Sequence, residues 1–173
     1  MVVGAYRYAD ETGRTLYVKE RLEPKRFRQF VPTPGGRQWT LNGTRRVLYR
    51  LPEVLEAVAD GRLIFLCEGE KDTESVRSAG VVATTWTDGA WQPGAAPKWR
   101  PEYSEQLFGG WVVIVRDRDR AGRATAWDVA GELRSVAAGV QVVRPAYGKD
   151  AFDHLAAGLG VSDFIAEENG ELV

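Results

Sequence analysis

The sequence has one cysteine, one histidine and no hydrophobic run long enough to cross a membrane. A single cysteine excludes an internal disulfide framework and a zinc site built from several cysteines. The absence of a long apolar run excludes a membrane-spanning helix, and the first residues lack the apolar core of a signal peptide. We therefore expect a protein that works in a reducing, cytoplasmic compartment without contacting a membrane.

The chain has 173 residues, of which 44% are hydrophobic, enough to form a packed core. Its net charge of -1 conceals an asymmetry. Residues 1–50 hold 11 Lys and Arg against 4 Asp and Glu, whereas residues 51–173 hold 12 against 20. This division predicts a basic segment at 1–50 that lies on a polyanion, and an acidic domain at 51–173 that holds cations. The alternative is a basic segment whose charges are merely solvated.

The pattern of the first fifty residues predicts a small β-rich segment. Apolar and polar residues alternate at 6–8 and 15–18, with a turn signal at Asp10–Gly13 between them. Residues 27–31 continue the predicted sheet. Trp39–Leu41 and Val47–Tyr49 are further strand candidates.

From Leu51 onward, apolar runs alternate with helical patterns. The predicted strands are 63–67, 81–85, 111–116 and 140–143, and the predicted helices are 52–60, 72–79, 121–138, 152–157 and 161–168. Continuous apolar strands separated by helices are typical of parallel sheets. The expected fold is therefore α/β, with a mainly parallel four-stranded sheet flanked by helices. Residues 86–110 interrupt the alternation, and Trp91 and Trp99 there either stack on bases or anchor the loop.

Two of the predicted strands end in acidic residues. Glu68 follows the first strand, and Asp117 and Asp119 follow the third. Parallel strands end at the same edge of a sheet, where ligands bind, and residues two apart on an extended chain point the same way. Converging carboxylates repel one another, and Mg²⁺ relieves that repulsion. The pattern favours a magnesium site, with Glu68 as a further ligand or a proton carrier. The alternative is a charged, solvated turn.

Three motifs, in order along the chain, resemble those of the TOPRIM domain. They are Glu68-Gly69-Glu70-Lys71-Asp72, then Asp117-Arg118-Asp119-Arg120-Ala121-Gly122-Arg123, then Gly148-Lys149-Asp150. The likeness is greatest to the primase and primase-helicase branch of phages and mobile elements. Residues 25–29 and 47–54 resemble the segment that precedes TOPRIM in such proteins. The resemblance therefore covers most of the chain and implies a TOPRIM-like sheet.

By this resemblance, Glu68 is the general acid/base, and Asp117 and Asp119 are magnesium ligands, with Mn²⁺ as a possible substitute. Glu68 is also a candidate third ligand. The candidates for phosphate and substrate binding are Asp72, Arg118, Arg120 and Lys149. Arginine forks suit phosphate oxygens, although these arginines could instead neutralise neighbouring carboxylates.

The resemblance implies primer synthesis from nucleoside triphosphates on single-stranded DNA. A metal-dependent nuclease and a non-catalytic nucleic-acid-binding accessory module are the alternatives. The chain lacks the cysteine-rich zinc module and the helicase domain of replicative primases, so we expect another chain to supply them.

Among the remaining residues, Lys25, Arg26 and Arg28 are the candidates for nucleic-acid binding. Phe27 and Phe30 at strand spacing are expected in the core. We expect Cys67 to act as a small buried hydrophobe. His154, on a predicted helix, is expected at the surface or capped.

Overall fold

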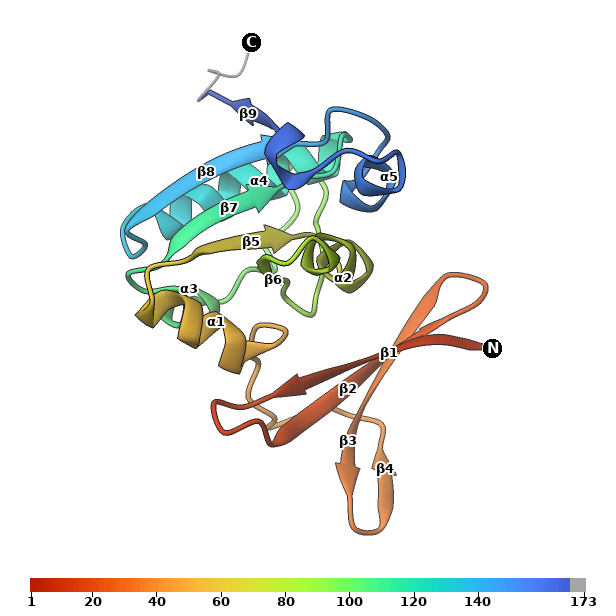
Figure 1. Cartoon of the computed structure of the whole chain (residues 1–173). Helices are drawn as coiled ribbons and strands as arrows, with labels where there is room; N and C mark the ends of the chain where they lie inside the picture. The colour runs from red at the N-terminus through yellow and green to blue at the C-terminus, as the bar shows by residue number, and fades with distance from the viewer. Residues whose placement is uncertain (169–173) are drawn as a thin grey trace.

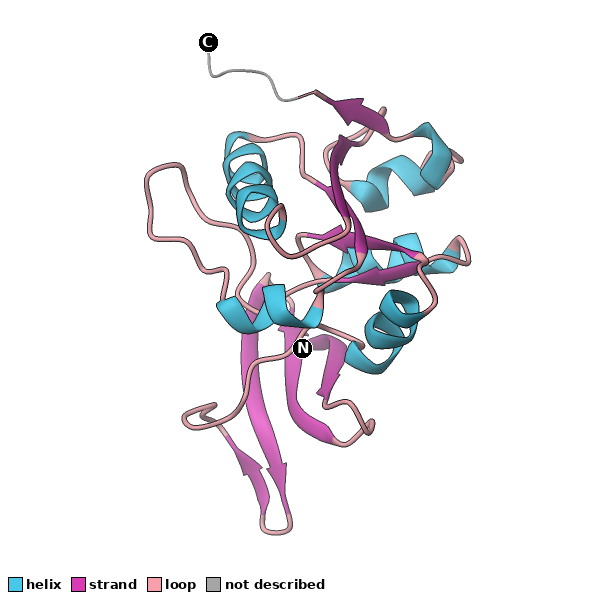
Figure 2. Ribbon diagram, turned by 90° about the vertical axis from the view of Figure 1, so that its left-hand side faces the viewer, coloured by secondary structure: helices cyan, strands magenta, loops and turns pink. Residues whose placement is uncertain are grey.

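The computed structural model describes residues 1–168, which form two sheets (Figure 1). The first is antiparallel, and its strands follow one another in the order β1-β2-β3-β4. Their bounds are β1 (Val2–Ala9), β2 (Thr15–Leu22), β3 (Arg26–Thr33) and β4 (Gly36–Gln38). The predicted turn joins β1 to β2. The Asp10 carboxylate stabilises it by accepting hydrogen bonds from the N–H groups of Thr12 and Arg14. The β3–β4 hairpin extends away from the rest of the molecule (Figures 1 and 2).

The core of this sheet is aromatic and is closed by irregular chain. Tyr8 and Tyr17 are fully buried and stacked, with ring centroids 4.6 Å apart. Leu41, Val47 and Tyr49 pack against them. The predicted strands at 39–41 and 47–49 are wrong, because these segments are not paired to a sheet. Their apolar residues instead fill the core from loops.

The second sheet is mainly parallel and has the strand order β6-β5-β7-β8-β9. Its strands are β5 (Leu63–Cys67), β6 (Val82–Thr84), β7 (Trp111–Val115), β8 (Gly139–Arg144) and β9 (Ile165–Glu167). All four expected strands are present, and the sheet has a fifth. The helix predicted at 161–168 is wrong: a short 3₁₀ turn, Val161–Asp163, leads into β9, which pairs antiparallel with β8.

Helices cover both faces of this sheet (Figure 2). On one face, α1 (Leu51–Ala59), α3 (Pro101–Gln106) and α4 (Arg120–Leu133) pack over alternate strand residues such as Ile64 and Ile114. On the other, α2 (Glu70–Ser78) and α5 (Ala151–Ala156) pack over Cys67 and Val115. Cys67 is thus a small buried hydrophobe, as predicted. None of the helices within residues 1–168 is both long and apolar enough to cross a membrane.

The long segment at 86–110 is anchored by its tryptophans. Trp86 makes edge-to-face contacts with Trp91 and Trp99. The Trp91 Nε1–H donates to Asp128 at 2.8 Å, and the Trp99 Nε1–H donates to Ser104 at 2.8 Å. Of the two roles considered for Trp91 and Trp99, these contacts match anchoring of the loop.

His154 is fully buried, which contradicts the expectation of a surface position. Its ring stacks on Phe164, with centroids 4.4 Å apart. Its Nδ1 accepts a hydrogen bond from the Ala146 N–H, and its Nε2 lies 2.9 Å from the Gly160 carbonyl oxygen. The polar ring atoms are therefore satisfied inside the fold, which makes the burial tolerable.

A buried ion pair joins the two sheets. Lys19 Nζ lies 2.8 Å from Glu70 Oε1 and donates to the carbonyl oxygen of Thr87. The Tyr8 hydroxyl donates to the same Glu70 oxygen at 2.6 Å. Lys19 and Glu70 are only 6% and 3% exposed. Because Glu70 is the first residue of α2, this contact fixes the N-terminal sheet against the segment that follows β5.

Candidate active site

The candidate site begins where two neighbouring parallel strands end. Glu68 directly follows β5, and its Oε1 accepts a hydrogen bond of 2.8 Å from the backbone N–H of Asp117. Asp117 lies two residues after the end of β7, with Arg116 between them. The strand-end acids predicted from the sequence are therefore brought together, and Glu68 bridges the two strand ends.

Asp119 directly precedes helix α4 as its N-cap. Its Oδ1 accepts from the Gly122 N–H at 2.8 Å, which caps the helix, and its Oδ2 lies 3.4 Å from Lys149 Nζ. Gly122 has no room for a side chain, because an added Cβ would lie 2.8 Å from the Asp117 carbonyl oxygen and would clash with Glu68 Oε1. The glycine of the second motif is thus required for the close approach of α4 to Glu68 and Asp117.

Negative charge is concentrated around these residues. Burial and then the charge of Asp117 raise the pKa of Glu68 well above its usual range. Burial, followed by the charges of Asp72 and Asp150, also raises the pKa of Asp117. Burial raises the pKa of Asp72 to about 6. By contrast, the hydrogen bond from Gly122 lowers the pKa of Asp119. The cluster therefore favours binding of protons or cations.

A cavity of about 280 Å³ lies between the two sheets at this cluster. Glu68, Asp117 and Asp119 line it on the side of the parallel sheet. The N-terminal sheet contributes the opposite lining, which is basic and aromatic: Tyr6, Lys19, Arg21, Lys25 and Phe27. The cavity thus combines acidic groups, which suit a cation, with basic groups, which suit phosphate.

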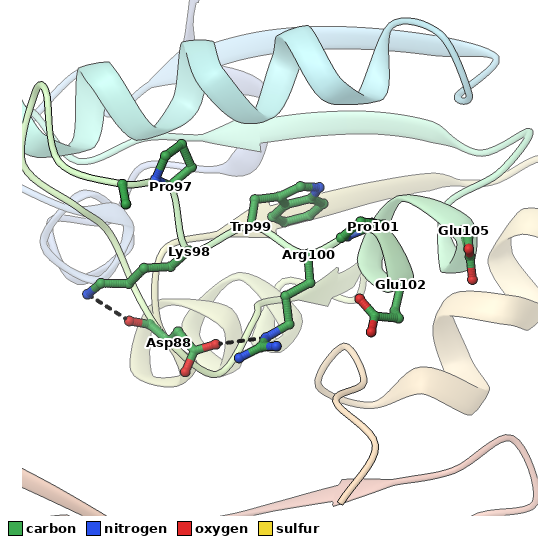
Figure 3. Close-up of a pocket in the computed structure, with 9 residues that line it drawn as sticks. Asp88, Pro97, Lys98, Trp99, Arg100, Pro101, Glu102 and Glu105 are labelled. Atoms are coloured by element: carbon green, nitrogen blue, oxygen red, sulfur yellow. Dashed lines mark hydrogen bonds and ion pairs between the residues drawn. The ribbon is translucent and has the colours of Figure 1, made fainter. Parts of the chain in front are cut away.

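A larger cavity, of about 950 Å³, lies beside the long segment and not at the acids (Figure 3). Lys98 and Arg100 both reach Asp88: Lys98 Nζ donates to the Asp88 carbonyl oxygen, and the Arg100 side chain lies 3.5 Å from its carboxylate. Both cations of this cavity and Asp88 are thus engaged in holding the loop. We place the site at the smaller cavity, because the converging acids line that one.

The structure brings some of the predicted site residues together and separates others. Asp72, Lys149 and Lys25 line the same cavity as the three acids. Four others do not: Arg118 donates to the Gly148 carbonyl, Arg28 is bound to Glu20, and Arg26 and Arg120 are exposed. The basic segment therefore presents its cations to two different faces.

Sequence reasoning missed the contribution of the N-terminal strands to the cavity. Tyr6, Lys19 and Arg21 line it, and Phe27, predicted to be core, is 44% exposed there. Phe30 is buried as expected. The alternation was a usable signal, because residues three apart on a strand face opposite sides, so Phe27 and Phe30 cannot share a core face.

The donor set fits magnesium. Within residues 1–168, no three His, Cys, Asp or Glu side chains form a ready-made metal cage. Magnesium does not need one, since it keeps several waters and is usually held by one or two carboxylates together with substrate phosphates. Asp117 and Asp119 supply such carboxylates beside Glu68.

No family model matches the chain, and no curated protein is similar to it in sequence. Its fold, however, is that of DNA primase domains. A DNA primase domain from Pseudomonas aeruginosa superposes with a TM-score of 0.63 at 22% identity, over 88% of this chain and 46% of that one. The primase fragment of the bacteriophage T7 primase-helicase protein gives 0.59 at 19% identity, over 89% and 57%. The DnaG primase catalytic domain bound to ssDNA gives 0.60 at 21% identity, over 91% and 49%. The chain spans about half the length of these structures.

Proposed function

We propose that this chain is a TOPRIM-type, magnesium-dependent nucleotidyltransferase that synthesises primers as DNA primases do. The observation that carries the proposal is the meeting of Glu68, Asp117 and Asp119 at the ends of adjacent parallel strands, facing a basic wall. The primase-like fold supports it. In this proposal residues 1–50 are the basic nucleic-acid-binding segment, and the catalytic domain extends from residue 51.

In the proposed reaction, a 3′-hydroxyl oxygen attacks the α-phosphorus of a nucleoside triphosphate. A new P–O bond forms, the bond from the α-phosphorus to the bridging oxygen breaks, and pyrophosphate leaves. Glu68 takes the proton of the attacking hydroxyl, a role that suits a carboxylate whose pKa is raised towards neutrality. Lys149, which lines the cavity, would contact phosphate.

Asp117 and Asp119 would hold Mg²⁺, or Mn²⁺ in its place. A role of Glu68 as a further ligand is the alternative to its role as the base. A metal held there would neutralise phosphate charge and stabilise the attacking and leaving oxygens. Single-stranded DNA and nucleoside triphosphates are the proposed substrates. We propose that a zinc module and a helicase act together with this chain.

The deciding experiment incubates the protein with Mg²⁺ or Mn²⁺, nucleoside triphosphates and single-stranded DNA. New oligonucleotides that depend on all components would support primer synthesis. Shortened DNA without synthesis would favour a nuclease with the same acids, water replacing the 3′-hydroxyl. DNA binding without either product would favour an accessory module.

Removing either aspartate is expected to weaken Mg²⁺ binding. Asp117→Asn and Asp119→Asn should each lower the affinity by roughly tenfold or more, since changing even the outer partners of a metal site costs 10- to 100-fold. The helix cap should survive, because Asn caps as well as Asp. Calorimetric titration with Mg²⁺ would measure this, with the exposed and remote Asp60→Asn as control. Wild-type affinity in both variants would remove them from the metal site.

The same Asp117→Asn variant should melt at a higher temperature than wild type in metal-free buffer. The folded pKa of Asp117 is raised, so ionisation costs stability as pH rises from the ordinary value, about 3.9, to the folded one. The gain should therefore be larger at pH 8 than at pH 5. A lower melting temperature at pH 8 would mean that the carboxylate stabilises the fold.

The basic segment is expected to bind single-stranded DNA with an affinity that falls steeply with salt. Each phosphate neutralised on a single strand contributes about 0.7 to the slope of log affinity against log salt. Changing Lys25, Arg26 and Arg28 together to Ala should therefore reduce that slope by up to about 2. Arg28 should contribute least, because Glu20 already neutralises it.

The matched control for this triple variant changes Arg7, Arg14 and Arg62 to Ala. It loses the same charge from exposed positions that do not line the acidic cavity. Fluorescence-anisotropy titrations across a salt series would compare the two. Equal slopes for both variants would show that the charge of the segment acts only through the net field of the protein.

A further inference from the structure

Phe27 is the exposed phenylalanine that faces the acid-lined cavity. It lies near the start of β3 and is paired with Arg21 of β2. Lys19 makes a cation–π contact with the Phe27 ring, its Nζ lying 4.8 Å from the ring centre. The ring therefore serves neither the core of the sheet nor the core of the α/β unit, and its exposed surface is turned to the same space as Glu68 and Asp117.

The cations around Phe27 fall into two groups. Lys19 already forms an ion pair with Glu70 and donates a hydrogen bond to the Thr87 carbonyl oxygen. Arg21 and Lys25 also line the cavity, and neither forms an ion pair with any residue that the structure describes. The wall opposite the acids thus presents an aromatic ring flanked by two cations available to an anionic ligand.

We propose that Phe27 stacks on the base of a nucleoside triphosphate whose phosphates lie between the acids and Arg21 and Lys25. The inference rests on the proposed function and adds the residue that positions the base. An aromatic ring suits this task because every base has a π face, so stacking holds all four bases alike. In a templated polymerase, pairing with the template base selects the nucleotide. The residue that holds the incoming base should therefore accept all four bases.

The opposite face of the same sheet offers a matched control. Trp39 is 52% exposed, and its ring is covered by the Arg28 guanidinium at 4.7 Å. Arg28 in turn is held by Glu20. Trp39 is thus an exposed aromatic residue beside cations, as Phe27 is, but it does not line the acidic cavity.

The test compares binding of ATP and of inorganic triphosphate in Mg²⁺ by calorimetry. Stacking on an aromatic side chain contributes about 1–3 kcal/mol per base, so Phe27→Ala should weaken ATP binding about 5- to 150-fold. Its affinity for inorganic triphosphate should not change, because that ligand has no base. Phe27→Trp and Trp39→Ala should bind ATP like wild type. Phe27→Leu, which keeps the apolar bulk without the ring, should lose as much as Phe27→Ala.

Two results would overturn the role of Phe27 alone: wild-type ATP affinity in Phe27→Ala, or an equal loss of ATP and inorganic triphosphate. A wild-type protein that binds neither ligand in Mg²⁺ would overturn the proposed function and this inference with it. Melting temperatures of the variants, expected to stay close to wild type for an exposed ring, separate a binding effect from unfolding.

Discussion

Glu68→Gln is expected to lower turnover by ~10²- to 10⁴-fold, the usual contribution of positioned proton transfer. Glutamine keeps an oxygen that can accept the hydrogen bond from the Asp117 N–H, so the strand ends should stay joined. It cannot carry the proton. Affinity for single-stranded DNA, which we assign to the basic segment, should barely change. Single-turnover primer synthesis beside a DNA-binding titration would measure both, with the exposed Glu56→Gln as control.

The response to metal separates two roles for Glu68. A general base that is missing cannot be replaced by more metal, so turnover should stay low at any Mn²⁺ concentration. A missing ligand only weakens metal binding, so excess Mn²⁺ should restore much of the activity by mass action. Wild-type turnover in Glu68→Gln would exclude both roles.

Lys19→Met is expected to destabilise the protein by about 3–5 kcal/mol, the usual cost of leaving one partner of a buried ion pair alone. Within residues 1–168, Glu70 would then keep only the Tyr8 hydroxyl as a side-chain partner for its charge. The matched control is Arg45→Met, which breaks the exposed pair of Arg45 with Glu11 and should cost less than about 1 kcal/mol. Urea unfolding of both variants would measure the difference.

The double variant Lys19→Met with Glu70→Leu tests the cause of that loss. Replacing both members of a buried pair by apolar residues is often close to neutral, so much of the stability should return. If the double variant were as unstable as Lys19→Met, the lost packing of the lysine side chain, rather than an unpaired carboxylate, would explain the effect.

The parallel sheet could be predicted because its strands are buried on both faces. Leu63–Cys67 and Trp111–Val115 show nearly continuous apolar runs, and few other structures accommodate such runs. The acids that follow them could then be placed at one edge of the sheet. Glu68 and Asp117 could therefore be located from the sequence alone.

Edge and loop elements could not be predicted in the same way. In 161–168, the apolar residues Val161, Phe164 and Ile165 have helical spacing, but the segment gains more from pairing with β8 and from placing Glu167 beside Arg116. Leu41, Val47 and Tyr49 likewise carry a strand-like pattern while filling the core from loops. Tertiary partners decide such segments, and local sequence does not reveal them.

The part of the cavity lining that comes from the N-terminal sheet could not be predicted from the sequence for a related reason. It is built from residues 41 to 62 positions before Glu68 and at least 90 before Asp117. No local sequence pattern predicts which face of the N-terminal sheet packs against the parallel sheet. The buried pair between Lys19 and Glu70 sets that meeting. Its partners look like ordinary surface charges in the sequence.

The contact of Tyr8 and Lys19 with Glu70 also has a consequence for folding. The strands β1 to β4 each pair with their neighbours in the chain, so the antiparallel sheet has a low contact order and needs only short loops to close. The contacts that complete the cavity span 51 to 62 residues and carry a larger loop-closure entropy. The cavity is therefore the part of the molecule expected to assemble last and to open first in native-state fluctuations. The proposed nucleotide site would then form and dissolve as a cooperative unit.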